Sequence, residues 1–277
     1  MTYKKKDNRN SRKELEKKNN YTGFLKSRNL KWTVIVAAVI IIIVVVAVTN
    51  PFFKPPQSIS AGSYYKVSDT DLLSNGSSGI YFLSWIGCPI GATDSWAIYY
   101  GINSTENISG HVALHTADPL DVYSNQTTGQ PGLLFTGNFS FTDSGHKVTL
   151  YPLYIYNETM SGTTANKTIT GSLASYGLSL VNSTYPPAVA AIFNKYASDI
   201  TYKGHLTTTV LITGPHGSYI FNSYMYSVVS GGVLGSGSPD HGSWSPHTPQ
   251  YVMSHLGTAT NVQGGATAFM QHIAKVE

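Results

Sequence analysis

The sequence contains a single cysteine, Cys88, among 277 residues. Because a disulfide needs two thiols, no bridge can form within this chain. Charged residues are also scarce, since Asp, Glu, Lys and Arg together make up 12% of the sequence, about half the usual share for a soluble domain. We therefore expect uncharged polar groups to cover the surface of the folded part.

The common catalytic signatures are missing as well. The sequence has no Gly-x-Ser-x-Gly elbow, no Walker loop and no glycine fingerprint at the start of a predicted helix. The glycine-rich stretch at residues 230–245 has the composition of a flexible loop, and adjacency alone does not make Asp240 and His241 a catalytic dyad. These absences favour a non-catalytic protein over an enzyme.

Charge is distributed unevenly along the chain. Residues 1–32 carry 11 Lys or Arg and three acidic residues, a net charge of +8, whereas the rest of the chain carries −4. Residues 33–48 follow without any charge, and 12 of these 16 residues are Val or Ile. At about −0.4 kcal/mol per central Val or Ile, this run favours insertion into a bilayer by roughly 5 kcal/mol.

These features predict a transmembrane anchor over residues 32–50. The apolar run spans about 24 Å, and Trp32 can extend it at the interface. Positive charge stays on the cytoplasmic side, so residues 1–31 predict a disordered cytoplasmic tail near anionic lipid, and the C-terminal domain lies outside the cell membrane. The expected partners are the membrane and an envelope protein, not nucleic acid. A cleaved signal peptide is the alternative, because it also combines a basic region with an apolar run.

The segment after the anchor is rich in glycosylation sequons. Eight asparagines have Ser or Thr two positions on with no Pro between, where chance predicts roughly two or three; they are Asn75, Asn103, Asn107, Asn125, Asn138, Asn157, Asn166 and Asn182. This enrichment predicts a glycosylated exterior domain, and a Ser/Thr/Asn-rich surface without sugar is the alternative. Asn20 also matches, but it lies in the cytoplasmic tail and is expected to stay unmodified.

The remaining residues predict an α/β domain over 61–277, joined to the anchor by a proline-containing linker at 51–60. Residues 79–86 are nearly all apolar, which is typical of a strand buried on both faces. Pro89 fits the first position of a helix that ends near Gly101. Other expected elements are strands at 63–67 and 111–116, a β-rich insertion near 120–184, a helix after Pro187, a hairpin within 206–226 and helices at 249–256 and 265–275.

The stretch SWIGCPIGATDSWAIYY, residues 84–100, carries a resemblance. The order of elements resembles the thioredoxin arrangement, and the stretch itself is similar to an archaeal membrane-anchored family catalogued as domain of unknown function 929. This resemblance implies a thioredoxin-like mixed sheet with flanking helices. Where a thioredoxin has Cys-x-x-Cys, this chain has Cys88-Pro89-Ile90-Gly91, and the stretch KGHLTTT lacks the expected cis-proline. Dithiol oxidoreductase activity is therefore not expected.

Cys88 is the candidate catalytic residue. A thiol at a helix N-terminus is favoured as thiolate, so we expect the pKa of Cys88 to lie below about 8.5. Such a monothiol can form mixed disulfides, be oxidised or bind a soft metal. The alternative is a small buried side chain that fills space together with Gly87, Gly91 and Ala92.

The nine histidines do not predict a metal site. On a strand, His111 and His115 lie about 13 Å apart and cannot bind one ion. No His-x-x-x-His spacing on a firm helix supports a site among the remaining candidates, which are His205, His216, Asp240, His241, His247 and His255. We predict no metal and no cofactor.

Two hypotheses of function remain open. The first is a membrane-anchored extracytoplasmic domain with a non-catalytic binding or envelope role. The second is a monothiol redox or metal-handling protein that acts through Cys88. Exposure of the thiol, with a cation or histidine beside it, would favour the second.

Overall fold

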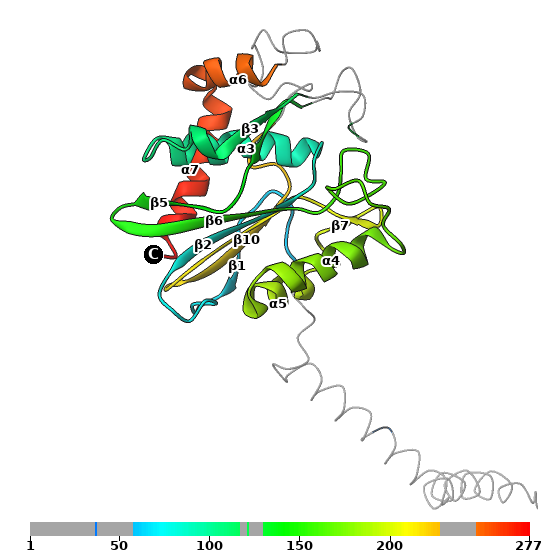
Figure 1. The fold of residues 1–277 in the computed structure, drawn as a ribbon. Helices are drawn as coiled ribbons and strands as arrows, with labels where there is room; N and C mark the ends of the chain where they lie inside the picture. The colour runs from blue at the N-terminus through cyan, green and yellow to red at the C-terminus, as the bar shows by residue number, and fades with distance from the viewer. Residues whose placement is uncertain (1–36, 38–57, 117–120, 122–129, 228–247) are drawn as a thin grey trace, which may run out of the picture. The chain divides into compact units, whose positions relative to one another are not determined.

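The apolar run after Asn75 forms the centre of a six-stranded mixed sheet in the order β1-β10-β9-β2-β6-β5 (Figure 1). All seven residues of β2 (Ser78–Ser84) are buried, as predicted for a central strand. β2 pairs in parallel with β6 (His146–Tyr154) and antiparallel with β9 (Thr209–Gly214). The outer strands are β1 (Tyr65–Ser68), β10 (Gly217–Asn222) and β5 (Phe139–Asp143).

This computed structural model describes residue 37 and residues 58–116, 121, 130–227 and 248–277. The predicted tail at 1–31 lies outside the described residues, as do the anchor at 32–50, apart from residue 37, and most of the linker at 51–60. Within the described ranges, no helix is both long enough and apolar enough to span a bilayer. The folded unit comprises Ser58–Glu277.

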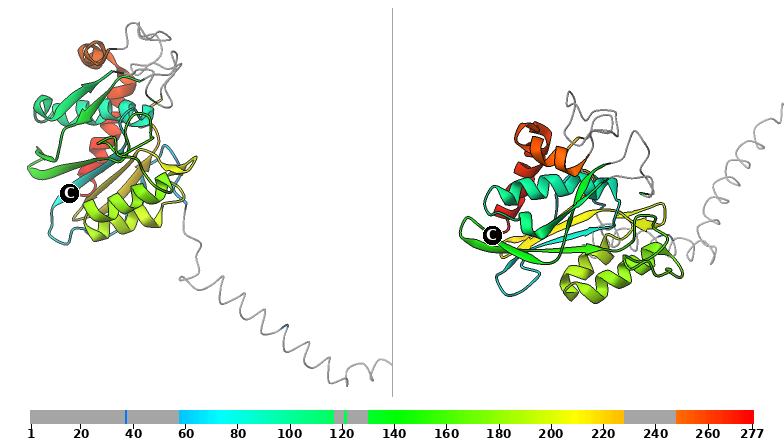
Figure 2. Two further views of the ribbon diagram at one scale, coloured as in Figure 1. Left: turned by 45° about the vertical axis from the view of Figure 1, so that its right-hand side comes forward. Right: turned by 45° about the horizontal axis from the view of Figure 1, so that its top comes forward.

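Helices cover both faces of the sheet (Figures 1 and 2). Because side chains alternate along a strand, β2 serves two cores: Ile80 and Phe82 face one, Tyr81 and Leu83 the other. The first core packs against α3 (Pro89–Asn103), α6 (Pro249–His255) and α7 (Thr260–Ala274), and the second against α4 (Leu173–Thr184) and α5 (Pro187–Lys195).

Short elements complete the unit. Two separate pairs of strands lie beside the main sheet, namely β3 (Val112–His115) with β4 (Gly132–Phe135), and β7 (Thr201–Tyr202) with β8 (His205–Leu206). The 3₁₀ turns are η2 (Ser109–His111) and η3 (Leu256–Thr258). The mixed α/β class with flanking helices is thus confirmed.

The predicted β-rich insertion over residues 120–184 is corrected by the sheet. β5 and β6 belong to the main sheet, and Leu173–Thr184 form helix α4. Among the described residues between α3 and the parallel strand β6, the elements are η2, β3, β4 and β5.

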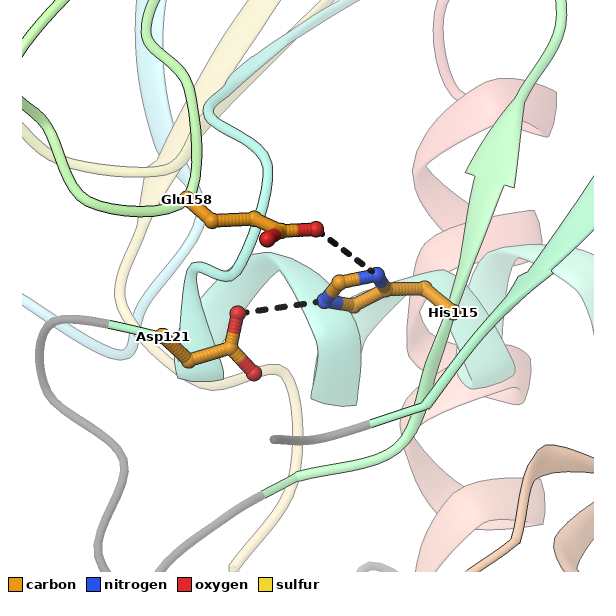
Figure 3. A group of neighbouring side chains, drawn as sticks. All are labelled: His115, Asp121 and Glu158. Carbon is orange, nitrogen blue, oxygen red and sulfur yellow. Dashed lines mark hydrogen bonds and ion pairs between the residues drawn. The ribbon is translucent and has the colours of Figure 1, made fainter. Parts of the chain in front are cut away.

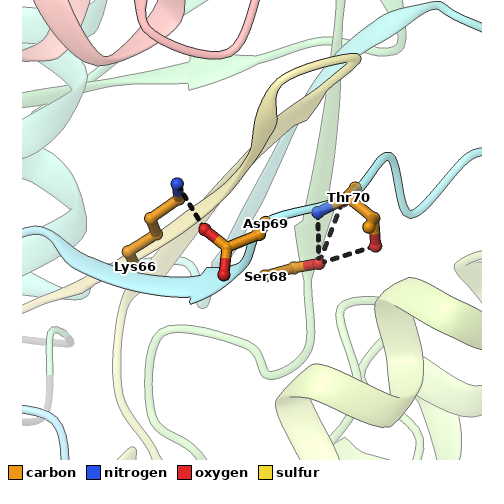
Figure 4. A network of polar contacts seen from close by, with 4 residues as sticks. All are labelled: Lys66, Ser68, Asp69 and Thr70. Carbon is orange, nitrogen blue, oxygen red and sulfur yellow. Dashed lines mark hydrogen bonds and ion pairs between the residues drawn. The ribbon is translucent and has the colours of Figure 1, made fainter.

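The end of β1 shows how an exposed edge strand ends (Figure 4). The Ser68 hydroxyl oxygen accepts a hydrogen bond from the Thr70 amide at 3.1 Å, while Lys66 Nζ lies 2.6 Å from Asp69 Oδ1. The pairing register with β10 shifts between Lys66 and Ser68. Both side chains of the ion pair are exposed to solvent, which screens their attraction.

Replacement of Phe141 by alanine tests whether β5 is part of the core. Phe141 is 1% exposed and packs in the same core as Ile80. We expect Phe141→Ala to lower the free energy of unfolding by about 3–5 kcal/mol. Urea unfolding of the full chain in detergent measures this, with the exposed neighbour Thr142→Ala as control. An unchanged unfolding midpoint in Phe141→Ala would show that β5 is peripheral.

Candidate functional site

The corner between β2 and α3 positions the only thiol. Cys88 is the N-cap of α3, and Pro89 is the first helical residue, as predicted. The Cys88 carbonyl accepts the Ala92 amide at 2.8 Å, and its Sγ accepts the Gly91 amide at 3.4 Å. The side chain thus takes the place that Ser or Asp usually has at a helix N-terminus.

A small polar cluster surrounds this thiol. Thr208, the residue before β9, has its Oγ1 3.0 Å from Cys88 Sγ and 2.9 Å from Ser84 Oγ. All three residues are buried, with Cys88 only 1% exposed. A buried thiol with hydroxyl partners is satisfied without ionisation, and solvent does not reach its sulfur.

Burial raises the pKa of the Cys88 thiol to about 11, although hydrogen bonds from Thr208, Gly91, Ile90 and Ser84 act in the opposite direction. The prediction that the pKa of Cys88 lies below its ordinary value is therefore wrong. The amides of α3 do favour the thiolate, but the free-energy cost of removing the charged form from water is larger than this stabilisation. At neutral pH Cys88 is a protonated thiol.

The corner leaves no space for a second thiol at the Cys-x-x-Cys position. A Cβ placed on Gly91 would overlap Ser84 Oγ and lie 3.0 Å from Thr208 Oγ1. Gly91 is therefore required by the close approach of α3 to the ends of β2 and β9. A larger residue at position 91 would require Ser84 or Thr208 to move.

A second group of side chains lies beside the same corner (Figure 3). His115, at the end of β3, has Nε2 3.3 Å from Asp121 Oδ1 and Nδ1 3.9 Å from Glu158 Oε1. His115 and Asp121 are buried, whereas Glu158 follows β6 and keeps about a third of its side chain exposed. One ligand atom from each residue lies within 4.8 Å of the others.

Gly87 connects this group to the thiol. It adopts a positive φ of 80°, and a Cβ there would overlap Asp121 Oδ1. Because Gly87 immediately precedes Cys88, the carboxylate of Asp121 packs directly against the corner. Sequence reasoning missed this group, since 43 positions separate His115 from Glu158 and no spacing motif links them.

The other histidines do not join the group among the residues that the structure describes. His111 is exposed, and its ring stacks on Phe139 with 4.7 Å between the ring centroids. His205 is buried beside Trp85, His216 is exposed, and His255 stacks on Tyr251. Asp240, His241 and His247 lie outside the described residues.

Asp94 is a buried carboxyl group on the same helix. Its Oδ1 accepts the Met225 amide at 2.7 Å, and its Oδ2 has no hydrogen-bond partner among the described residues. Burial raises the pKa of Asp94 well above its ordinary value of 3.8. The carboxyl group is therefore held in its protonated form above that pH.

The sequon asparagines lie on the surface where they are described. Asn75, Asn107, Asn138, Asn166 and Asn182 are exposed. Asn103 and Asn157 are half-buried, and Asn125 lies outside the described residues. Several of these amides use Oδ1 as an acceptor, as Asn107 does for the Ser109 amide at 3.0 Å. The nitrogen is the atom that carries an N-linked sugar, and in Asn157 it donates a hydrogen bond to Asn166 Oδ1 at 3.0 Å.

The fold and the corner define an α/β domain with one buried cysteine at the N-cap of its first long helix. The family model described as domain of unknown function (DUF929) matches residues 63–275, and the chain belongs to this family. This membership confirms the family indicated by residues 84–100. Comparison with curated proteins and with solved structures gave no match.

Replacement of Asp94 by asparagine tests the buried carboxyl group. Because the pKa of Asp94 is raised in the folded state, Asp94 makes its full contribution to the free energy of unfolding below about pH 4. As pH rises toward the folded pKa, this contribution is lost, because only the unfolded state ionises. Asp94→Asn is neutral throughout and keeps an oxygen for the Met225 amide. The unfolding free energy of Asp94→Asn minus that of the wild type is thus expected to increase from about pH 4 to 7.

Urea unfolding at a series of pH values measures this difference. Asp69→Asn, at a carboxyl group whose side chain is 87% exposed, is the control. Parallel pH curves for the wild type and Asp94→Asn would contradict a protonated Asp94.

Proposed function

We propose that this chain is a single-pass, membrane-anchored extracytoplasmic protein of thioredoxin-like fold with a non-catalytic binding role at the cell envelope. The observation that carries the proposal is the state of Cys88. The thiol is buried, protonated and hydrogen-bonded to Thr208. The corner around it has no space for a resolving thiol. A thioredoxin-like scaffold without an available thiolate suits recognition better than thiol exchange.

The topology supports the thioredoxin-like part of the proposal. β2, α3 and the parallel strand β6 form a β-α-β unit, after which α4 and α5 precede the antiparallel hairpin β9-β10 and α7. The four shared strands lie in the order β10-β9-β2-β6. Thr208 holds the position before β9 where the cis-proline of a thioredoxin would be expected.

The location rests on features of the sequence together with surface exposure. The +8 tail before an uncharged run of 16 residues supports an anchor with its N-terminus in the cytoplasm. The seven described sequon asparagines are all exposed or half-buried, as a glycosylated exterior surface requires. The resemblance to an archaeal membrane-anchored family is in keeping with this location.

The competing function, monothiol redox or metal handling through Cys88, requires a thiolate that solvent reaches. The hydrogen bonds that Cys88 Sγ receives favour a thiolate, but burial outweighs them in the pKa. Burial, with a smaller contribution from the charge interaction with Cys88, raises the pKa of Tyr224 to about 12, and this phenol adds no positive charge beside the sulfur. The geometry therefore favours the binding role.

Glycan mapping tests the location. We expect sugars on the exposed sites Asn75, Asn107, Asn138, Asn166 and Asn182, with lower occupancy at the half-buried Asn103 and Asn157. The physical reason is that a bulky glycan needs an asparagine nitrogen free of packing. Site-resolved mass spectrometry of the chain from its native host measures occupancy.

Substitutions provide the matched control. Asn138→Gln is expected to increase electrophoretic mobility, while Asn20→Gln in the predicted cytoplasmic tail leaves it unchanged. A glycan on Asn20, or bare asparagines at every exterior sequon, would refute the proposed orientation.

A further inference from the structure

We propose that His115, Asp121 and Glu158 bind one divalent metal ion, with Zn²⁺ as the best fit to one imidazole and two carboxylates. Zn²⁺ accepts His nitrogen and Asp or Glu oxygen, and three protein ligands leave a fourth position for water. This site is separate from the proposed binding role and does not depend on where the domain is located.

The separations suit a shared ion. Ligands about 2.1 Å from zinc in a tetrahedral arrangement lie roughly 3.4 Å from one another. His115 Nε2 and Asp121 Oδ1 already meet this spacing at 3.3 Å, whereas Glu158 Oε1 faces the other ring nitrogen, Nδ1, at 3.9 Å. Because one ion binds one nitrogen of an imidazole, the Glu158 carboxylate has to move to the Nε2 side of the ring. The widest spacing in the group, up to 4.8 Å, has to shorten by about 1.4 Å. Glu158, with a long and 32% exposed side chain, is the ligand able to move that far.

The charges also favour a cation. A neutral imidazole has one N–H and can donate to only one of the two carboxylates that face it. Asp121 is buried, and a buried carboxylate is costly unless its charge is balanced. A divalent ion bound to neutral His115 carries two positive charges and can face both carboxylates at once.

The position of the three ligands predicts what the ion does. They come from the end of β3, from the segment beside Gly87 and from the connection that follows β6. One ion would therefore fasten three chain segments at the corner that carries Cys88. The thiol of Cys88 is not a ligand in this proposal, because its sulfur is hydrogen-bonded to Thr208.

Zinc binding by the full chain tests the proposal. The protein in detergent is stripped with EDTA, dialysed and titrated with Zn²⁺, and bound zinc and melting temperature are measured. We expect one Zn²⁺ per chain and a melting temperature that rises with Zn²⁺ concentration. Glu158→Gln, at a partly exposed position where folding should survive, is expected to weaken zinc binding at least tenfold, because loss of a residue that only supports a ligand already costs about 10–100-fold at metal sites.

Three variants serve as controls. Glu106→Gln and His216→Asn remove an exposed carboxylate and an exposed imidazole elsewhere, and Cys88→Ser removes the thiol; all three should bind like wild type. Equal affinity in wild type and Glu158→Gln would overturn the site. Loss of binding in Cys88→Ser would overturn the ligand set. No stoichiometric zinc in the folded wild type, with stabilisation by acid alone, would assign the group to an ion pair of protonated His115.

Discussion

The fold depends on how closely α3 approaches the ends of β2 and β9. Ser84, Cys88 and Thr208 share one buried set of polar contacts there, and glycine is needed at residue 91 because any Cβ would meet Ser84. Gly87 has the same role toward Asp121 on the other side of the corner. Close packing at two glycines thus fixes both the position of the thiol and the position of the neighbouring carboxylate.

This constraint determines the chemistry of the corner. A cysteine at an N-cap can be a strong nucleophile when it faces solvent, because helix amides stabilise the thiolate. In this chain the same amide contact is present at Gly91, but the sulfur is 1% exposed and its pKa rises. Desolvation is therefore the larger effect, and the helix N-terminus stabilises the fold instead of activating a nucleophile.

Much of the fold follows from local sequence signals, and the departures have physical causes. The strand at Ser78–Ser84 and the helix start at Pro89 were predictable because an apolar run and an N1 proline act locally. Helix α4 was missed since its Ser and Gly residues have weak helix propensity, and tertiary packing of Val181 overrides it. α7 begins at Thr260, whereas the sequence predicted a helix over 265–275. The two glycines at 264 and 265 weaken the local helix signal, but Gly265 lies inside the helix, where it packs closely against Tyr226.

The site was less predictable than the fold. Burial of Cys88 depends on Thr208, 120 residues away, and the group around His115 forms only when Glu158 meets His115 and Asp121. Neither contact leaves a spacing pattern in the sequence.

The most direct test of the account is the rate at which a membrane-impermeant maleimide labels Cys88 on intact cells as a function of pH. Thr142→Cys in a Cys88→Ala background, at an exposed position of β5, controls for access to the domain. The account predicts rapid labelling of that control and none of Cys88 until the chain is unfolded. Labelling of native Cys88 with a midpoint below about pH 8 would contradict it, because that result requires an exposed thiolate.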